Sequence, residues 1–122
     1  MSSSAAPARS IVVATAVVEA VHFWPDAPGA VAYLRAPHRH LFHVRGEWCV
    51  VHADRAVEFH IARRMLVSAF EFLYGAQPSD LGTRSCEQVA VELRNAVPEP
   101  RPSAVEVWED GENGARVEWP VA

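Results

Sequence analysis

The chain has 122 residues, of which 50% are apolar, and its formal net charge is −4. This length predicts a single domain with a sizeable hydrophobic core, and the scattered basic residues form no cluster with aromatics, which argues against a nucleic-acid partner. The longest apolar run, residues 11–21, contains Glu19 and is too short to span a membrane. The cysteines Cys49 and Cys86 share no close spacing, which favours a reducing, cytoplasmic location.

The order of elements predicts an α+β fold. Residues 1–9 are small and polar and are interpreted as a disordered leader, so the domain is expected to cover residues 10–122. Residues 10–24 and 38–52 indicate two strands, residues 57–74 and 85–97 two helices, and residues 104–109 and 115–119 a terminal hairpin. Two consecutive helices between two strand pairs predict a four-stranded antiparallel sheet in the order ββααββ, with both helices on one face.

Two further signals refine these boundaries. The spacing Ser85-Cys86-Glu87-Gln88 is that of a capping box and places the start of the second helix. The glycines and asparagine of residues 110–114 are expected to supply the positive φ angles of the hairpin turn, and residues 75–83 are expected to be a loop.

Histidines provide the clearest candidate site. His38 and His40 are two residues apart on a predicted strand, so their side chains leave the same face, whereas His43 points to the other face. His22 lies at the end of the neighbouring strand, where it can supply a third ligand. Three neutral imidazoles suit Zn²⁺ and leave a coordination position open, so we predict a zinc site of His22, His38 and His40.

The arrangement of these motifs resembles the 6-pyruvoyl- and 6-carboxy-tetrahydropterin synthase family. In that family a histidine ends the first strand, H-x-H opens the second, a P-T-x-E-N-like turn opens the second helix, and a strand ends in V-x-V-x-E-T. In this chain the turn at the start of the second helix is Arg84-Ser85-Cys86-Glu87-Gln88. The strand ending that resembles V-x-V-x-E-T is Val105-Glu106-Val107-Trp108-Glu109-Asp110. The resemblance implies the tunnelling fold (T-fold), and a homo-oligomer with active sites at subunit interfaces.

The resemblance also implies roles for individual residues. Glu109 takes the position that holds the pterin ring, and Glu87, in the variant of the P-T-x-E-N-like turn, is the other candidate substrate-binding residue. The cysteine that precedes H-x-H in the family has no counterpart in residues 32–37, and the histidine of its Asp-His pair has none in residues 75–83. The remaining candidates for a catalytic base are Asp80, Tyr33 or a group from a second subunit.

Three functions are therefore compatible with the sequence. The first is a zinc-dependent carbon–oxygen lyase of the tetrahydropterin synthase type, acting on a pterin-like small molecule. The second is a metal-containing pterin- or purine-binding protein without synthase activity. The third is an oligomeric scaffold in which the histidines are structural.

Overall fold

The computed structural model describes residues 9–121, so all but one residue of the predicted leader lies outside the description. These residues form five strands, two α-helices and a 3₁₀ segment. In chain order they are β1 (Ser10–His22), η2 (Gly29–Arg35), β2 (His38–Val50), α1 (Phe59–Tyr74), β3 (Ser79–Gly82), α2 (Cys86–Ala96), β4 (Ala104–Glu109) and β5 (Asn113–Glu118).

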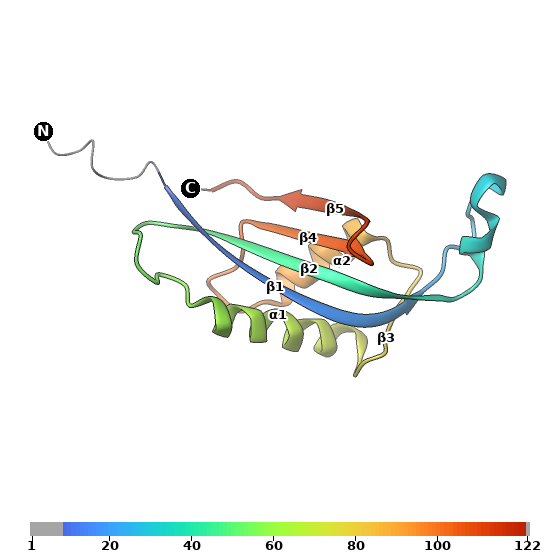
Figure 1. The fold of residues 1–122 in the computed structure, drawn as a ribbon, viewed down its shortest axis with the longest axis horizontal. Coiled ribbons are helices and arrows are strands. Elements are labelled where there is room, and N and C mark those ends of the chain that lie inside the picture. The colour runs from blue at the N-terminus through green and yellow to red at the C-terminus, as the bar shows by residue number, and fades with distance from the viewer. Residues whose placement is uncertain (1–8, 122) are drawn as a thin grey trace, which may run out of the picture.

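One sheet in the order β3-β1-β2-β4-β5 runs through the molecule, and both α-helices cover the same face of it (Figure 1). The two long strands β1 and β2 are antiparallel and pair along their whole length, from Ser10 opposite Val50 to His22 opposite His38. The connection between them, which contains η2, projects beyond the end of the sheet (Figure 1).

Period-two alternation decides which face of the sheet is buried. Even-numbered residues of β1 and β2 and odd-numbered residues of β4 face the helices. The buried apolar side chains among them are Ala14, Ala16, Val18, Ala20, Phe42, Val44, Trp48, Val105 and Val107. Gly46 is required in this layer because a Cβ atom there would lie 2.8 Å from the Trp48 ring. The small side chains of β1 leave room for Leu66 and Phe70 of α1, which are fully buried.

The helices begin where side chains satisfy their free N–H groups. The Glu58 carboxylate accepts hydrogen bonds from the backbone N–H groups of His60 and Ile61 at the start of α1. Both hydrogen bonds of the predicted capping box between Ser85 and Gln88 are present at the start of α2. The predicted start of the second helix is therefore confirmed.

The expected four-stranded antiparallel sheet in the order ββααββ is wrong in two respects. The segment Ser79–Gly82, predicted to be a loop, forms β3 between the two helices and pairs in parallel with β1, so the sheet is five-stranded and mixed. Leu81 is the only large apolar side chain in this segment, and its complete burial holds the strand against the core. The α+β class is confirmed.

No helix in the described part of the chain covers the opposite face of the sheet, which carries a charged network at the β5 side. Arg116 lies 2.7 Å from carboxylate oxygens of both Glu47 and Glu106. The hydrogen bonds from Arg116 and Arg45 outweigh the effect of burial and lower the pKa of Glu47 to about 2. No helix in residues 9–121 is long and apolar enough to span a membrane.

Candidate metal centre and adjoining pocket

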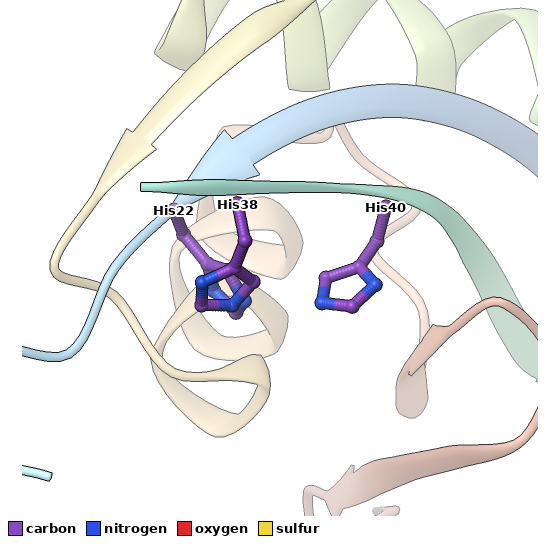
Figure 2. A group of neighbouring side chains, drawn as sticks. All are labelled: His22, His38 and His40. Carbon is purple, nitrogen blue, oxygen red and sulfur yellow. The ribbon is translucent and has the colours of Figure 1, made fainter. Parts of the chain in front are cut away.

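The register of β1 and β2 brings the three predicted histidines together at one end of the sheet. His22 is directly opposite His38, and His40 is opposite Ala20, so all three lie on even positions of the helix-facing side. Figure 2 shows their imidazoles projecting from the same side of the two strand ends. The histidine cluster is thus a continuation of the buried face beyond the apolar core.

The three imidazoles are close enough to share one ion. One ring nitrogen from each of His22, His38 and His40 lies within 4.8 Å of the others. The ring centroids are 4.5 Å apart for His22 and His38 and 5.0 Å apart for His38 and His40. The predicted grouping of these residues is therefore present in the structure, and it is compatible with a metal site.

Hydrogen bonds orient each imidazole through its Nδ1 atom. His22 Nδ1 lies 3.2 Å from the carbonyl oxygen of Arg84, and His38 Nδ1 lies 2.9 Å from that of Ala36. His40 Nδ1 lies 2.6 Å from Oδ2 of Asp110. Because carbonyl and carboxylate oxygens only accept, the Nδ1 atoms carry the protons, and the Nε2 lone pairs are left for a ligand.

The burial of the Nε2 atoms provides a test of whether the residues fit a metal. The Nε2 atoms of His22 and His40 are buried and have no hydrogen-bond partner among the described residues. Buried polar nitrogens are rarely left in this state, since the loss of hydration costs about 1–3 kcal/mol for each group. Three oriented imidazoles, two of them with such nitrogens, therefore fit a metal ion as its ligands.

Asp110 is a site residue that the sequence analysis did not identify. It follows β4 in the hairpin turn with a left-handed φ of 54°. Its backbone N–H donates to the carbonyl of Leu41 at 2.7 Å, and its Oδ1 accepts from the Leu41 N–H at 3.0 Å. These bonds fix the carboxylate beside His40, and the hydrogen bond from His40 lowers the pKa of Asp110.

Glu109 lies against the same histidines. Its Oε2 is 3.0 Å from His22 Nε2 and its Oε1 is 3.6 Å from His40 Nε2, although neither contact has the geometry of a hydrogen bond. The approach of the His22 imidazole lowers the pKa of Glu109 in spite of partial burial. The carboxylate is therefore ionised at neutral pH and can only accept hydrogen bonds.

A cavity of about 780 Å³ adjoins this centre. His22, His38 and Glu109 form one part of its wall, and the segment from Thr83 to Gln88 forms another. Phe23, Trp24 and Leu34 supply apolar surface. A cavity of this size, apolar but with a few polar groups, accommodates a small heterocyclic ligand.

Cys86 also lines the cavity, which the sequence did not indicate. Burial raises the pKa of its thiol to about 12, with a further contribution from the nearby Glu109 carboxylate. The sequence signal was limited to its place at the first position of α2, next to Ser85.

The other predicted site residues lie in different places. Glu87 lines the cavity beside Cys86. Asp80 lies on β3, where its Oδ1 accepts a hydrogen bond from the Gly82 N–H at 2.8 Å, and it does not line the cavity. Tyr33 lies in η2, is 74% exposed and is also outside the cavity lining.

Comparison with known proteins supports the resemblance at the level of the fold. The sequence matches no protein-family model and no curated protein. The structure is similar to that of 6-pyruvoyl tetrahydropterin synthase from Caenorhabditis elegans, with a TM-score of 0.61 and 11% sequence identity, over 94% of this chain and 99% of that chain. This likeness shows a related fold. The activity of the chain has to be argued from its own residues.

Proposed function

We propose that the chain is a zinc-dependent protein of the 6-pyruvoyl/6-carboxy-tetrahydropterin synthase type that acts on a pterin-like small molecule. The observation that carries this proposal is the oriented triad of His22, His38 and His40, of which His22 and His38 line a cavity large enough for the ligand. The similar fold of a tetrahydropterin synthase supports it.

The donor set favours zinc and an accessible site. Three protein ligands are typical of catalytic zinc centres, whereas structural centres have four. When bound, the ion would supply Lewis acidity toward a hydroxyl or carbonyl oxygen of the substrate side chain. The Nδ1 hydrogen bonds of the three histidines hold the imidazoles in place for that ion.

Glu109 is proposed to bind the heterocycle. An ionised carboxylate accepts two parallel hydrogen bonds from the N–H groups of a 2-amino-4-oxo ring, and the lowered pKa of Glu109 keeps it in this form. Glu87 is the second proposed substrate-binding carboxylate, and Trp24 and Phe23 offer apolar surface to the ring.

The second candidate function is a metal-containing pterin- or purine-binding protein without synthase activity. The positions of Asp80 and Tyr33 favour it, because neither proposed base lines the cavity.

We also propose that copies associate into a homo-oligomer with sites at subunit interfaces. The uncovered sheet face supports association, because it exposes Ile11, Val17 and Leu41.

Zinc content and ligand turnover test these proposals together. We expect the purified protein to hold one zinc per chain, His38→Ala to lose it, and His43→Ala to keep it, because His43 lies on the opposite face of the same strand. Zinc-loaded protein is then incubated with 7,8-dihydroneopterin or its triphosphate, and the products are separated by chromatography.

Turnover that disappears in His38→Ala supports the enzyme, whereas zinc-dependent binding of these pterins without turnover supports the second candidate. If the protein holds no stoichiometric zinc and binds neither pterin, both functions are refuted. Light scattering of the same samples measures the mass of the particle and tests self-association.

A further inference from the structure

The imidazole of His22 is oriented by a backbone group of the segment between β3 and α2. Its Nδ1 lies 3.2 Å from the carbonyl oxygen of Arg84, the longest of the three Nδ1 contacts in the triad. His22 is only 9% exposed, and its buried Nε2 has no hydrogen-bond partner among the described residues. Because a carbonyl oxygen moves with the backbone of its own residue, the contacts that hold Arg84 also hold this imidazole.

Arg84 is held by three elements of the fold. Its backbone N–H and its Nη1 both donate to the carbonyl oxygen of Leu81 in β3, at 3.1 and 3.2 Å. Its Nε donates to Oε1 of Glu92 in α2 at 2.7 Å. Its guanidinium also lies over the ring of Tyr74, the last residue of α1, 5.3 Å from the centroid. The side chain of Arg84 therefore ties its own backbone to β3 and to both α-helices.

Glu92 and Tyr74 are linked to each other as well. The hydroxyl of Tyr74 donates to the same Oε1 of Glu92 at 2.8 Å, so one carboxylate oxygen accepts two short hydrogen bonds. Tyr74 is buried, and this burial together with the carboxylate raises the pKa of its hydroxyl, which keeps the proton that it donates. The carboxylate of Glu92 is thus fixed from the side of α1 and in turn fixes the guanidinium of Arg84.

The position of these three side chains separates an effect on the metal from an effect on stability. The side chains of Arg84 and Glu92 are 42% and 39% exposed, and ion pairs at such exposure contribute little to the free energy of unfolding. Neither Glu92 nor Tyr74 belongs to the described lining of the cavity, so neither is placed to contact a ligand there. Their consequence is geometric, because they fix the carbonyl group that accepts from His22.

We propose, on the basis of the proposed zinc site, that Glu92 is a positioning residue of the metal centre, which acts through Arg84 on the orientation of His22. Loss of its carboxylate frees the guanidinium, lets the backbone at Arg84 shift, and removes the fixed acceptor of the His22 Nδ1 proton. Replacement of a group that contacts a metal-bound histidine directly weakens metal binding about 10- to 100-fold. Glu92 lies one contact further out, so Glu92→Ala should weaken zinc binding about three- to tenfold.

Zinc affinity and the geometry of the bound ion are measured side by side. A chromophoric chelator competes for the zinc, and the visible absorption of the Co²⁺-loaded protein reports the coordination geometry. We expect Glu92→Ala to weaken binding and to alter the Co²⁺ spectrum. Glu92→Gln should stay within about twofold of the wild-type affinity, because its amide oxygen still accepts from both Arg84 and Tyr74.

Two arginines with similar surroundings give the matched comparison. Arg94 also donates through its Nε to a carbonyl, that of Pro102 at 3.2 Å, and lies over an aromatic ring, that of Trp119 at 4.8 Å. Its own carbonyl accepts from the N–H of Val97 rather than from a histidine. Arg84→Met should therefore weaken zinc binding at least about threefold, whereas Arg94→Met should leave it unchanged.

Circular dichroism and urea unfolding establish that each variant is folded, and Arg84→Met takes the place of Glu92→Ala if the latter is not. Zinc binding within about twofold of the wild-type affinity in Glu92→Ala, or in Arg84→Met in its place, overturns this inference alone. Equal weakening by Glu92→Gln or by Arg94→Met overturns it as well. A wild-type protein that holds no stoichiometric zinc contradicts the proposed function, and this inference with it.

Discussion

The hydrogen bond between Asp110 and His40 leads to a sharp prediction about metal affinity. The two carboxylate oxygens of Asp110 accept at the same time, Oδ2 from His40 Nδ1 and Oδ1 from the Leu41 N–H. In Asp110→Asn only one oxygen remains. If the amide keeps the Leu41 bond, its NH₂ faces His40 Nδ1 and moves the imidazole proton to Nε2, the atom that should bind the ion.

The expected size of the effect follows from this change of tautomer. Loss of an outer-shell carboxylate typically weakens metal binding 10- to 100-fold, which corresponds to about 1.4–2.8 kcal/mol. Asn is the suitable replacement because Asp110 has a φ of 54°, a left-handed conformation that asparagine also adopts readily. The backbone of the turn should therefore be kept.

Competition with a chromophoric zinc chelator measures the affinity, and circular dichroism and urea unfolding show whether the fold is intact. Glu112→Gln is the matched control, since it removes one charge from the same turn and its carboxylate forms no ion pair in the described part of the chain. The reasoning is refuted if Asp110→Asn, correctly folded, binds zinc within threefold of the wild-type affinity, or if Glu112→Gln weakens binding equally.

Three further predictions concern other parts of the molecule. Glu109→Gln should keep its zinc but bind neopterin at least tenfold more weakly in a fluorescence titration, and unchanged affinity would contradict its role. The pKa of Glu47 is about 2 in the folded chain against 4.5 ordinarily, so its ionisation stabilises the fold above pH 4.5 and the effect is lost as the pH falls toward 2. Glu47→Gln should lower the free energy of unfolding at pH 7 by about 2 kcal/mol and flatten its fall over that pH range in urea titrations. Gly46→Ala places a Cβ 2.8 Å from the Trp48 ring and should cost about 1–3 kcal/mol in the same assay, whereas Gly29→Ala, with nothing within 4 Å, should stay within about 0.5 kcal/mol.

The sequence predicted those parts of the fold that depend on local periodicity. Alternation along residues 38–52 was sufficient to place His38 and His40 on one face, and the capping box located the start of α2. β3 could not be found in this way, because a four-residue strand with one large apolar side chain has no periodic signal. It exists because its backbone bonds to β1 and Leu81 fills the core.

The candidate site was predictable to a similar extent. Strand positions alone grouped the histidines, but the contact of Asp110 with His40 spans 70 positions and depends on how the hairpin turn meets β2. The turn itself was expected at residues 110–114, with positive φ at glycine and asparagine. The structure places positive φ at Asp110 and Gly111, and the left-handed Asp110 is the residue that contacts the site.

The pairing of His22 with His38 at the end of two fully paired 13-residue strands connects ligand binding with folding. Because side chains alternate between faces, a slip of one residue between β1 and β2 would place one of these imidazoles on the opposite side from its partner. An ion held by the triad would therefore bind only the correctly registered sheet. At a free concentration one hundred times its dissociation constant, it would add about 2.7 kcal/mol to the free energy of unfolding, so the stability of the folded chain would depend on the metal supply.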